Sequence, residues 1–182
     1  AVLVDNIRGA REAVKHLITN GYRRIGAITG PKTITTGYER LLGYRQALEE
    51  AGIAHDPELE RLGVFKEGSG NQATNELLAL TPRIDALFVG NNTLTMGAMD
   101  ALHKHDLRVP DDVAIIGYDA MPWAALGSIS LTTVTQPVYE LGATAALRLF
   151  QHLQNSSAQT RQEIILTPTL RVLGSSLPPS QQ

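Results

Sequence analysis

The sequence of 182 residues contains no cysteine, which excludes disulfide bonds, thiolate nucleophiles and cysteine-ligated zinc. The same absence fits a reducing compartment. The sequence also has no excess of charge of one sign, because 16 Lys and Arg against 18 Asp and Glu give a formal net charge of −2. A balance so close to neutral argues against a basic nucleic-acid-binding surface within these residues and against a disordered acidic tail.

Long apolar runs are missing as well. No stretch approaches the roughly 20 apolar residues that a membrane-spanning helix needs. The first six residues, Ala1 to Asn6, are no signal peptide, since they lack a basic start and their apolar run ends at Asp5. The run at Val2–Val4 has the character of a strand entered from upstream. We therefore expect the chain to start in the middle of a larger protein.

What the sequence does contain is a repeated alternation of short strand-like runs and helical patterns. Strands are predicted at residues 2–4, 24–29, 62–65, 86–90, 113–117 and 131–135, and patterns of 3.6-residue period predict helices between them. The runs before Asp119 are apolar throughout rather than alternating, which is typical of a parallel sheet covered on both faces. We therefore predict an α/β fold with a doubly wound parallel sheet.

The regular alternation of predicted strands and helices ends after Asp119. Residues 121–130 are expected to form an irregular loop that contains the only tryptophan, and Pro137 is expected to open a helix that ends near residue 154. Two further strands, at 163–166 and 170–173, are separated by Pro168, which suggests a bend where the chain passes from one lobe to another. Residues 175–182 are expected to be a disordered tail.

Side chains suited to ligand binding follow the ends of the predicted strands. They are Thr36 and Arg40, Asn91 and Asn92, and Tyr118 and Asp119, with Phe65 at the end of a fourth strand. Ligands of open α/β sheets bind beyond the carboxyl ends of the strands, so these side chains should converge. An arginine donates through a rigid fork, an aspartate accepts and an asparagine does both, which suits ligand hydroxyl groups. Phe65 could cover an apolar ring face, so the pattern predicts a cleft for a sugar or a nucleoside.

Each of these residues also has a purely structural interpretation. Asn91 or Asn92 would cap the helix that follows it, and Asp119 would form a turn after a strand. Arg40 would decorate a helix surface, and Phe65 would belong to the core. The functional interpretation rests on the convergence of all of them at one edge of the sheet.

Other kinds of site find less support. Residues 30–37 lack the spacing and the final Gly-Lys-Ser/Thr of a phosphate-binding loop, and a Gly-x-Gly-x-x-Gly coenzyme motif is absent. His103 and His105 lie two residues apart on a predicted helix and point to different faces, which disfavours a metal site. We find no Gly-x-Ser-x-Gly elbow and no nucleophile with a nearby base, so we predict no catalytic residue, no metal and no cofactor.

Several short motifs occur in a fixed order along the chain. Asp5-Asn6, Gly9-Ala10, His16-Leu17-Ile18 and Gly21-Tyr22-Arg23-Arg24-Ile25 are followed by Arg40-x-x-Gly43-Tyr44, Ala47-Leu48, Val109-Pro110-Asp111-Asp112-Val113, Ile116-Gly117-Tyr118-Asp119 and Leu131-Thr132-Thr133-Val134-Thr135-Gln136-Pro137. In this order and spacing they resemble the LacI/GalR family of transcriptional repressors. The resemblance covers nearly the whole chain except the tail.

The resemblance implies a type I periplasmic-binding-protein fold, in which two α/β lobes close over a small effector. It implies that residues 1–174 are a fragment of the effector-binding domain, with the C-terminal lobe at about 7–134 and pieces of the N-terminal lobe at about 1–6 and 135–167. Crossings between the lobes would lie near 6–16, 133–137 and Pro168. Because only part of the N-terminal lobe is present, an exposed apolar face is expected.

The resemblance also implies a function. Members of the family are cytoplasmic, non-enzymatic regulators that form dimers and bind a sugar, a sugar phosphate or a nucleobase-type metabolite. They bind operator DNA through a helix-turn-helix headpiece, which is not in this chain. The family's ligand contacts match Thr36, Arg40, Phe65, Asn91 and Asp119. Asn92 departs from the family's usual aspartate, which removes a negative charge from the site.

Two alternative functions remain open from the sequence. A periplasmic sugar-binding protein of a transporter would share the fold and the cleft, although the Thr-Thr-Val-Thr-Gln-Pro segment favours the regulator. An α/β hydrolase or transferase would share the sheet but lacks a nucleophile–base set in this sequence.

Overall fold

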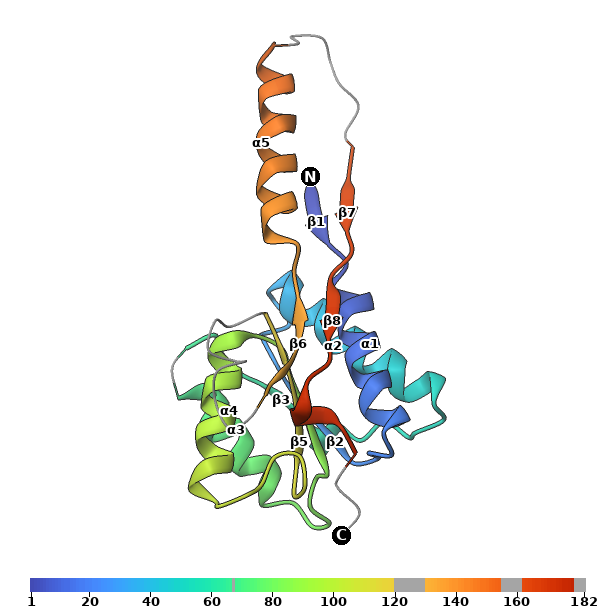
Figure 1. The fold of residues 1–182 in the computed structure, drawn as a ribbon, viewed down its shortest axis with the longest axis vertical. Coiled ribbons are helices and arrows are strands. Elements are labelled where there is room, and N and C mark those ends of the chain that lie inside the picture. The colour runs from blue at the N-terminus through green and yellow to red at the C-terminus, as the bar shows by residue number, and fades with distance from the viewer. Residues whose placement is uncertain (67, 120–129, 155–161, 179–182) are drawn as a thin grey trace.

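The computed structural model consists of a compact body and a projecting arm (Figure 1). It describes residues 1–66, 68–119, 130–154 and 162–178. The body contains strands β2 (Ile25–Thr29), β3 (Glu60–Leu62), β4 (Ala86–Val89), β5 (Ala114–Tyr118), β6 (Thr132–Thr135) and β8 (Thr169–Arg171), and helices α1 (Asn6–Thr19), α2 (Thr35–Glu50), α3 (Ser69–Leu78) and α4 (Asn92–Lys104). Among the described residues it also contains the short 3-10 helices η1 (Pro57–Leu59) and η3 (Gly174–Ser176). The arm contains β1 (Val2–Val4), α5 (Val138–Gln154) and β7 (Ile164–Leu166).

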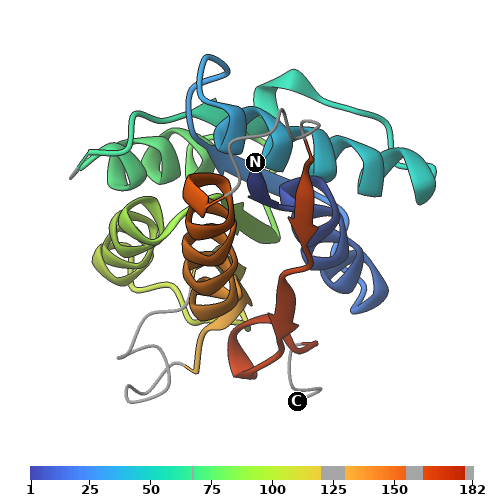
Figure 2. The ribbon, with the colours of Figure 1, turned by 90° about the horizontal axis from the view of Figure 1, so that it is seen from above.

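The body is a doubly wound α/β layer structure, as predicted. Its strands lie in the order β3-β2-β4-β5-β6-β8, and all neighbours are parallel except β6 and β8, which are antiparallel. Helices α1 and α2 cover one face, and α3 and α4 cover the other (Figure 2). The carboxyl ends of the five parallel strands therefore meet at one edge.

Two hydrophobic clusters, one on each face of the sheet, explain the continuous apolar runs. Phe88 and Ile116 point into the cluster under α1 and α2, whereas their neighbours Leu87 and Ile115 point into the cluster under α3 and α4. All four side chains are fully buried. A strand with a helix on each face needs apolar side chains at every position, and this removes the alternation typical of half-exposed strands.

Strand β3 lies earlier than the sequence predicted. We expected a strand at residues 62–65, but β3 spans Glu60–Leu62, where it pairs with β2 at the edge of the sheet. Leu62 and Val64 are about half exposed (45% and 52%), so the apolar run there does not mark a buried strand. The chain makes one more bond to the sheet, from Gly63 N–H to Thr29 O (2.8 Å), and then turns away.

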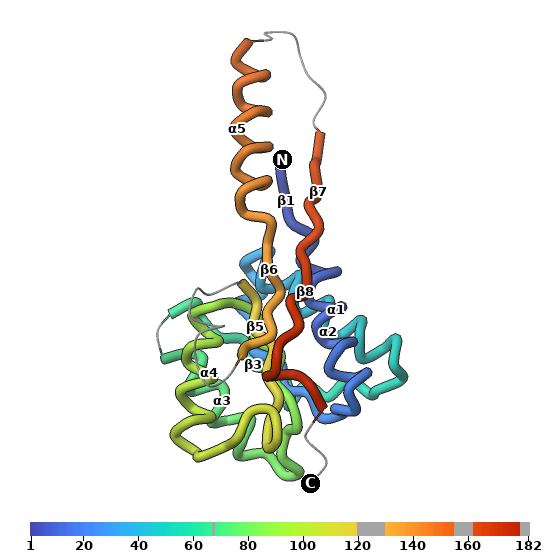
Figure 3. Tube along the Cα trace, in the orientation of Figure 1, coloured from blue at the N-terminus to red at the C-terminus, as the bar shows by residue number. Residues whose placement is uncertain are grey.

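The arm is joined to the body by three crossings of the chain (Figure 3). They run from β1 to α1, from β6 to α5, and from β7 to β8 through Pro168. Strands β1 and β7 pair in parallel, and α5 has no buried residue. The expected exposed apolar face is present on α5, where Leu147, Leu149, Phe150 and Leu153 are each more than half exposed.

The end of the described chain folds back on the body as a segment that we call the C-terminal clasp, comprising residues 173–177. Ser175 Oγ donates to Ile115 O (2.7 Å) and accepts from Thr132 N–H (2.8 Å). Ser176 Oγ lies 2.7 Å from Thr132 Oγ1 and 2.9 Å from His16 Nε2. The expectation of a disordered tail from Ser175 onwards is therefore wrong for 175–177, because both serines are buried and satisfy groups of the sheet and of α1.

The irregular loop expected at 121–130, with the single tryptophan, lies outside the described residues except for Ser130. Within the described ranges, no helix has the length and apolar character needed to cross a membrane.

Candidate functional site

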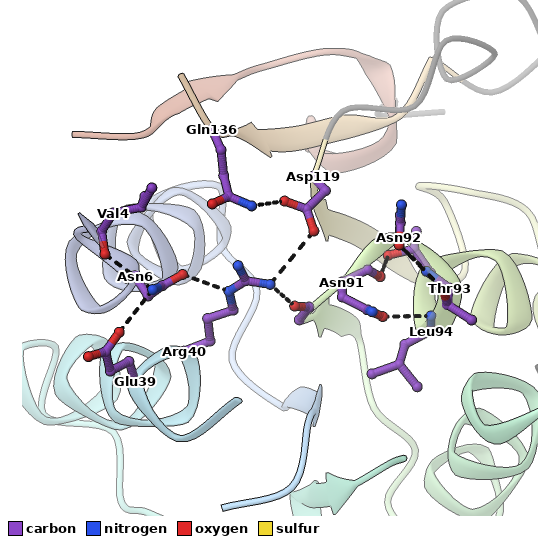
Figure 4. A network of polar contacts seen from close by, with 12 residues as sticks. Val4, Asn6, Glu39, Arg40, Asn91, Asn92, Thr93, Leu94, Asp119 and Gln136 are labelled. Carbon is purple, nitrogen blue, oxygen red and sulfur yellow. Dashed lines mark hydrogen bonds and ion pairs between the residues drawn. The ribbon is translucent and has the colours of Figure 1, made fainter. Parts of the chain in front are cut away.

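Arg40 is a buried cation at the carboxyl edge of the sheet. It lies on α2, and only 4% of its surface is exposed. Its Nε donates to Asn6 Oδ1 (3.0 Å), and its Nη1 donates to Gly90 O (2.6 Å) (Figure 4). A buried charge is tolerated only when it is paired and hydrogen-bonded, and these acceptors meet part of that need. Arg40 therefore does not decorate the helix surface.

Asp119 supplies the opposite charge. It follows β5 with φ of +74°, a left-handed conformation that aspartate tolerates better than most side chains, and its N–H donates to Val134 O (2.8 Å). Its Oδ2 lies 3.7 Å from Arg40 Nη1, and its Oδ1 accepts a hydrogen bond from Gln136 Nε2. The Asp119 side chain is 25% exposed, so the ion pair joins a buried charge to one that still contacts solvent.

The ring of Tyr118 lies under the guanidinium group. Arg40 Cζ is 3.6 Å from the ring centroid, which is a cation–π contact. Burial lowers the pKa of Arg40, and the nearby Asp119 carboxylate opposes that shift. Burial also raises the pKa of Tyr118 to about 12, so its hydroxyl group stays protonated at neutral pH.

Asn91 and Asn92 lie at the start of α4, beyond the end of β4. Asn91 Oδ1 accepts from Leu94 N–H (2.8 Å), which is the helix-capping bond expected from the structural interpretation. Asn92 Oδ1 accepts from Thr93 N–H (2.8 Å), and its side chain is exposed. Capping engages only the carbonyl oxygen of each amide, so the amino groups remain available to other partners.

Thr36 and Phe65 occupy the same edge. Thr36 is half-buried in the first turn of α2, one helical turn before Arg40. The Phe65 ring lies against Gly30, where a Cβ atom would come within 2.0 Å of the ring, and it also packs on the α3/α4 cluster. Phe65 thus packs partly on the core, as its structural interpretation predicts, and lies beyond the end of β2.

Several polar atoms at this edge have no hydrogen-bond partner within the described part of the chain. They are Arg40 Nη2, Asn91 Nδ2 and the buried hydroxyl groups of Thr29, Tyr118 and Thr135. A buried polar group without a partner is unfavourable, so such groups mark places where a ligand or water completes the bonding. A site with a charged donor, a carboxylate, amides and an aromatic ring can bind a hydroxyl-rich ligand. The described residues contain no cluster of three metal-ligating side chains.

Two residues of this network were missed by the sequence analysis. Asn6 bonds Arg40 from the start of α1, and Gln136 bonds Asp119 from the segment after β6. Both follow the carboxyl ends of strands, at Val2–Val4 and Thr132–Thr135. The strand-end rule would have found them had it been applied to these two strands.

The chain matches the family model of the periplasmic binding protein-like domain over residues 14–176. It is 37% identical over 164 residues to the HTH-type transcriptional regulator CelR of Thermobifida fusca, which covers 90% of this chain and 48% of that protein. It is 35% identical over 177 residues to the HTH-type transcriptional repressor CytR of Escherichia coli strain K12, covering 94% of this chain and 52% of the repressor. The chain thus spans about half the length of the curated relatives it matches.

Solved structures of regulators are also similar to this chain. The fold matches a complex of the regulator CelR with cellobiose at a TM-score of 0.90, with 37% identity, covering 96% of this chain and 53% of that one. It matches a LacI family regulator from Enterococcus faecium with bound ribose at a TM-score of 0.88, with 30% identity, covering 98% of this chain and 65% of that one.

Proposed function

Because this chain belongs to the LacI-type family of transcriptional regulators, through their periplasmic binding protein-like domain, we propose that it is the effector-sensing domain of a bacterial regulator. The effector is a small sugar or sugar derivative that binds between two lobes. Its binding controls how the whole protein attaches to operator DNA in the cytoplasm. No catalytic step and no cofactor is part of this function.

The observation that carries the proposal is the ion pair of Arg40 and Asp119. It lies at the edge of the sheet where ligands of α/β proteins bind, and its arginine has donors that no described residue uses. Thr36, Phe65 and Asn91 lie at the same edge and complete the ligand-binding set that we assign. Hydroxyl groups that both donate and accept suit a pair of one donor and one acceptor.

Control of DNA binding would follow from the position of this pair between the body and the arm. We assign the body to the C-terminal lobe, which comprises about 7–134 together with β8 and the C-terminal clasp, and the arm to pieces of the N-terminal lobe, at about 1–6 and 135–167. An effector that contacts both lobes binds one relative orientation better than others and so shifts the population toward it. The difference in effector-binding free energy between the two orientations then couples effector binding to operator binding.

The proposal includes a homodimer, formed through helices of this domain, that binds operator DNA through a headpiece outside this chain. Light scattering of the full-length protein tests the oligomeric state, and gel-shift titration with operator fragments tests DNA binding. A monomer at all concentrations would contradict the dimer. Effector binding without any DNA binding would instead favour the transporter-type sugar-binding protein, an alternative that the regulators among the relatives do not favour.

Calorimetry of the full-length protein with a sugar panel tests the effector site. The panel contains cellobiose and ribose, the ligands named with two of the related structures, together with their phosphates and a nucleoside. Arg40→Ala and Asp119→Ala should each weaken binding by roughly 10- to 150-fold, because hydrogen bonds to charged groups are worth about 1.5–3 kcal/mol. Arg45→Ala is the matched control. Arg45 lies on the same helix, but its Nη2 pairs with Glu60 Oε2 (2.6 Å) and not with Asp119.

Affinity that stays unchanged in both Arg40→Ala and Asp119→Ala would contradict the site. A loss of affinity in Arg45→Ala as large as that in Arg40→Ala would mean that the cause is a general loss of folded protein. A panel in which no sugar binds the wild-type protein would contradict the proposed class of effector.

A further inference from the structure

Asn6 occupies the point where the first crossing enters the body. It is the first residue of α1, directly after the turn that follows β1, and it is 5% exposed. Its side chain uses its full amide: Nδ2 donates to Val4 O (3.1 Å) and to Glu39 Oε2 (2.9 Å), while Oδ1 accepts from Arg40 Nε (3.0 Å) (Figure 4). One buried side chain thus joins the end of an arm strand to two consecutive residues of α2.

We propose that Asn6 is a positioning residue for Arg40, and that it ties the direction of the guanidinium group to strand β1. This inference rests on the proposed function, in which Arg40 contacts the effector. Asn6 does not itself need to contact the effector, because its donors and its acceptor already have protein partners.

The chemistry of the three bonds explains why an asparagine stands here. The site needs one acceptor, for the Arg40 Nε–H group, and two donors, for a backbone carbonyl and a carboxylate. An amide carries both kinds of group in one short, planar side chain. An aspartate would keep the bond to Arg40 but would face Val4 O and the Glu39 carboxylate with a second negative charge. An alanine would remove all three bonds.

The position of Arg40 depends on Asn6 because its other contacts leave one rotation open. Gly90 O and Asp119 both lie at the Nη1 end of the guanidinium group, and Tyr118 lies under its face. The covalent link of Nε to α2 runs through three methylene groups, whose torsions still let the guanidinium plane tilt about the Nη1 end. The bond from Nε to Asn6 holds the opposite end and fixes the direction in which Nη2 donates.

The other half of the ion pair is held in the same way from the second crossing. Gln136 lies between β6 and α5, and its Nε2 donates to Asp119 Oδ1. A continuous polar chain therefore runs from Val4 through Asn6, Arg40 and Asp119 to Gln136, with one end on each of two crossings. A change in the angle between arm and body moves Val4 and Gln136, and through them the two charged groups.

The test compares Asn6→Ala and Asn6→Asp with wild type in the full-length protein labelled with ¹⁵N-arginine. The first readout is the rate at which the Arg40 Nε–H proton exchanges with water, with its signal assigned by its loss in Arg40→Lys. Exchange should be at least about tenfold faster in Asn6→Ala, which lacks the acceptor, and close to wild type in Asn6→Asp, which keeps it.

The second readout is affinity for cellobiose and for ribose by calorimetry. Whichever sugar binds wild type should bind Asn6→Ala about tenfold or more weakly, and Asn6→Asp should recover to within about threefold of wild type. Both variants lose the bonds to Val4 O and Glu39, so both should lose stability. If Asn6→Asp, which keeps the acceptor, binds the sugar nearly as well as wild type despite its lost stability, the weak binding of Asn6→Ala results from a misplaced Arg40. A general structural effect would weaken binding in both variants.

Asn20→Ala is the matched control, because Asn20 ends the same helix and bonds Ser176 O (2.9 Å) in the C-terminal clasp, away from Arg40. It should lower stability while leaving the exchange rate and the affinity unchanged. Exchange within twofold of wild type in Asn6→Ala would overturn the proposal, as would an equal effect of Asn20→Ala. If neither sugar binds wild type, the proposed effector class fails, and the exchange rates still decide whether Asn6 positions Arg40.

Discussion

The two ends of the central sheet both carry buried polar groups, but they differ in how completely those groups are bonded. At the amino ends of β5 and β6, the C-terminal clasp pairs Ser175 with Ile115 O and Thr132 N–H, and pairs Ser176 with His16. At the carboxyl ends, the Tyr118 hydroxyl and Arg40 Nη2 have no partner among the described residues. A saturated network stabilises one conformation, whereas an unsaturated one retains hydrogen-bonding capacity for a ligand.

Ser175→Val is expected to produce a large loss of stability. The change removes a hydroxyl group that bonds both Ile115 O and Thr132 N–H, and it leaves two buried backbone groups without partners. Each such group costs about 1–3 kcal/mol, so the free energy of unfolding should fall by about 2–4 kcal/mol in urea titration. Thr19→Val, at an exposed position of α1, is the control and should change it by less than about 0.5 kcal/mol.

Effector affinity should not respond to Ser175→Val, because the clasp and the Arg40–Asp119 pair lie at opposite ends of the strands. A loss of stability below about 0.5 kcal/mol would mean that water replaces the lost bonds and that the clasp is not a saturated network. A large loss of effector affinity in a folded Ser175→Val protein would contradict the view that the amino end of the sheet provides stability and the carboxyl end binds the effector.

Arg40→Met is expected to lower effector affinity, which Ser175→Val leaves unchanged. It should weaken effector binding by about 100-fold, equivalent to about 2.7 kcal/mol. It should also lower the free energy of unfolding by about 2–4 kcal/mol, because it leaves the buried acceptors Gly90 O and Asn6 Oδ1 without their donor. Calorimetry and urea titration on the same preparations measure both quantities. A variant that binds normally and unfolds easily would make Arg40 a structural residue.

Tyr118→Phe should raise stability by up to about 1 kcal/mol. The tyrosine is fully buried, and its hydroxyl group has no partner within the described residues, so its removal eliminates an unsatisfied group. Tyr44→Phe is the matched control, because Tyr44 OH donates to Ile25 O (2.8 Å), and its removal should lower stability by about 1 kcal/mol. Equal losses in both variants would show that the Tyr118 hydroxyl group is bonded in solution.

The positions of the strands and of most site residues could be predicted, because both follow from local patterns. Continuous apolar runs mark strands buried on two faces, and parallel strands bring the residues that follow them to one edge. This reasoning placed Arg40, Asn91 and Asp119 at the edge where the structure has them. It was wrong for β3, an edge strand that is only partly buried and so carries a weak pattern.

The partners of these residues could not be predicted in the same way. Ser175 bonds a carbonyl 60 residues away, and a run of serines near a chain end has the composition of a tail. Asn6 and Arg40 are 34 residues apart, and their bond depends on how α1 packs beside α2. Such pairs depend on tertiary packing, which a local sequence pattern does not reveal.

The smallest expected effect is a pH dependence of stability from His16 in the clasp. Burial lowers the pKa of His16 in the folded protein, and a hydrogen bond to Ser176 opposes part of that shift. The unfolded chain therefore binds more protons than the folded one between the ordinary histidine pKa of about 6.5 and the lower folded value. Stability from this group is complete above that window and is lost as the pH falls through it.

Urea titrations of wild type and His16→Gln between pH 5 and pH 8 measure this contribution. Glutamine can still bond Ser176 but does not titrate, so the difference in unfolding free energy between the two proteins should change only across the window below about pH 6.5. A difference that is constant with pH would mean that His16 titrates alike in both states. The saturated end of the sheet would then owe its stability to fixed hydrogen bonds alone, with no contribution linked to protons.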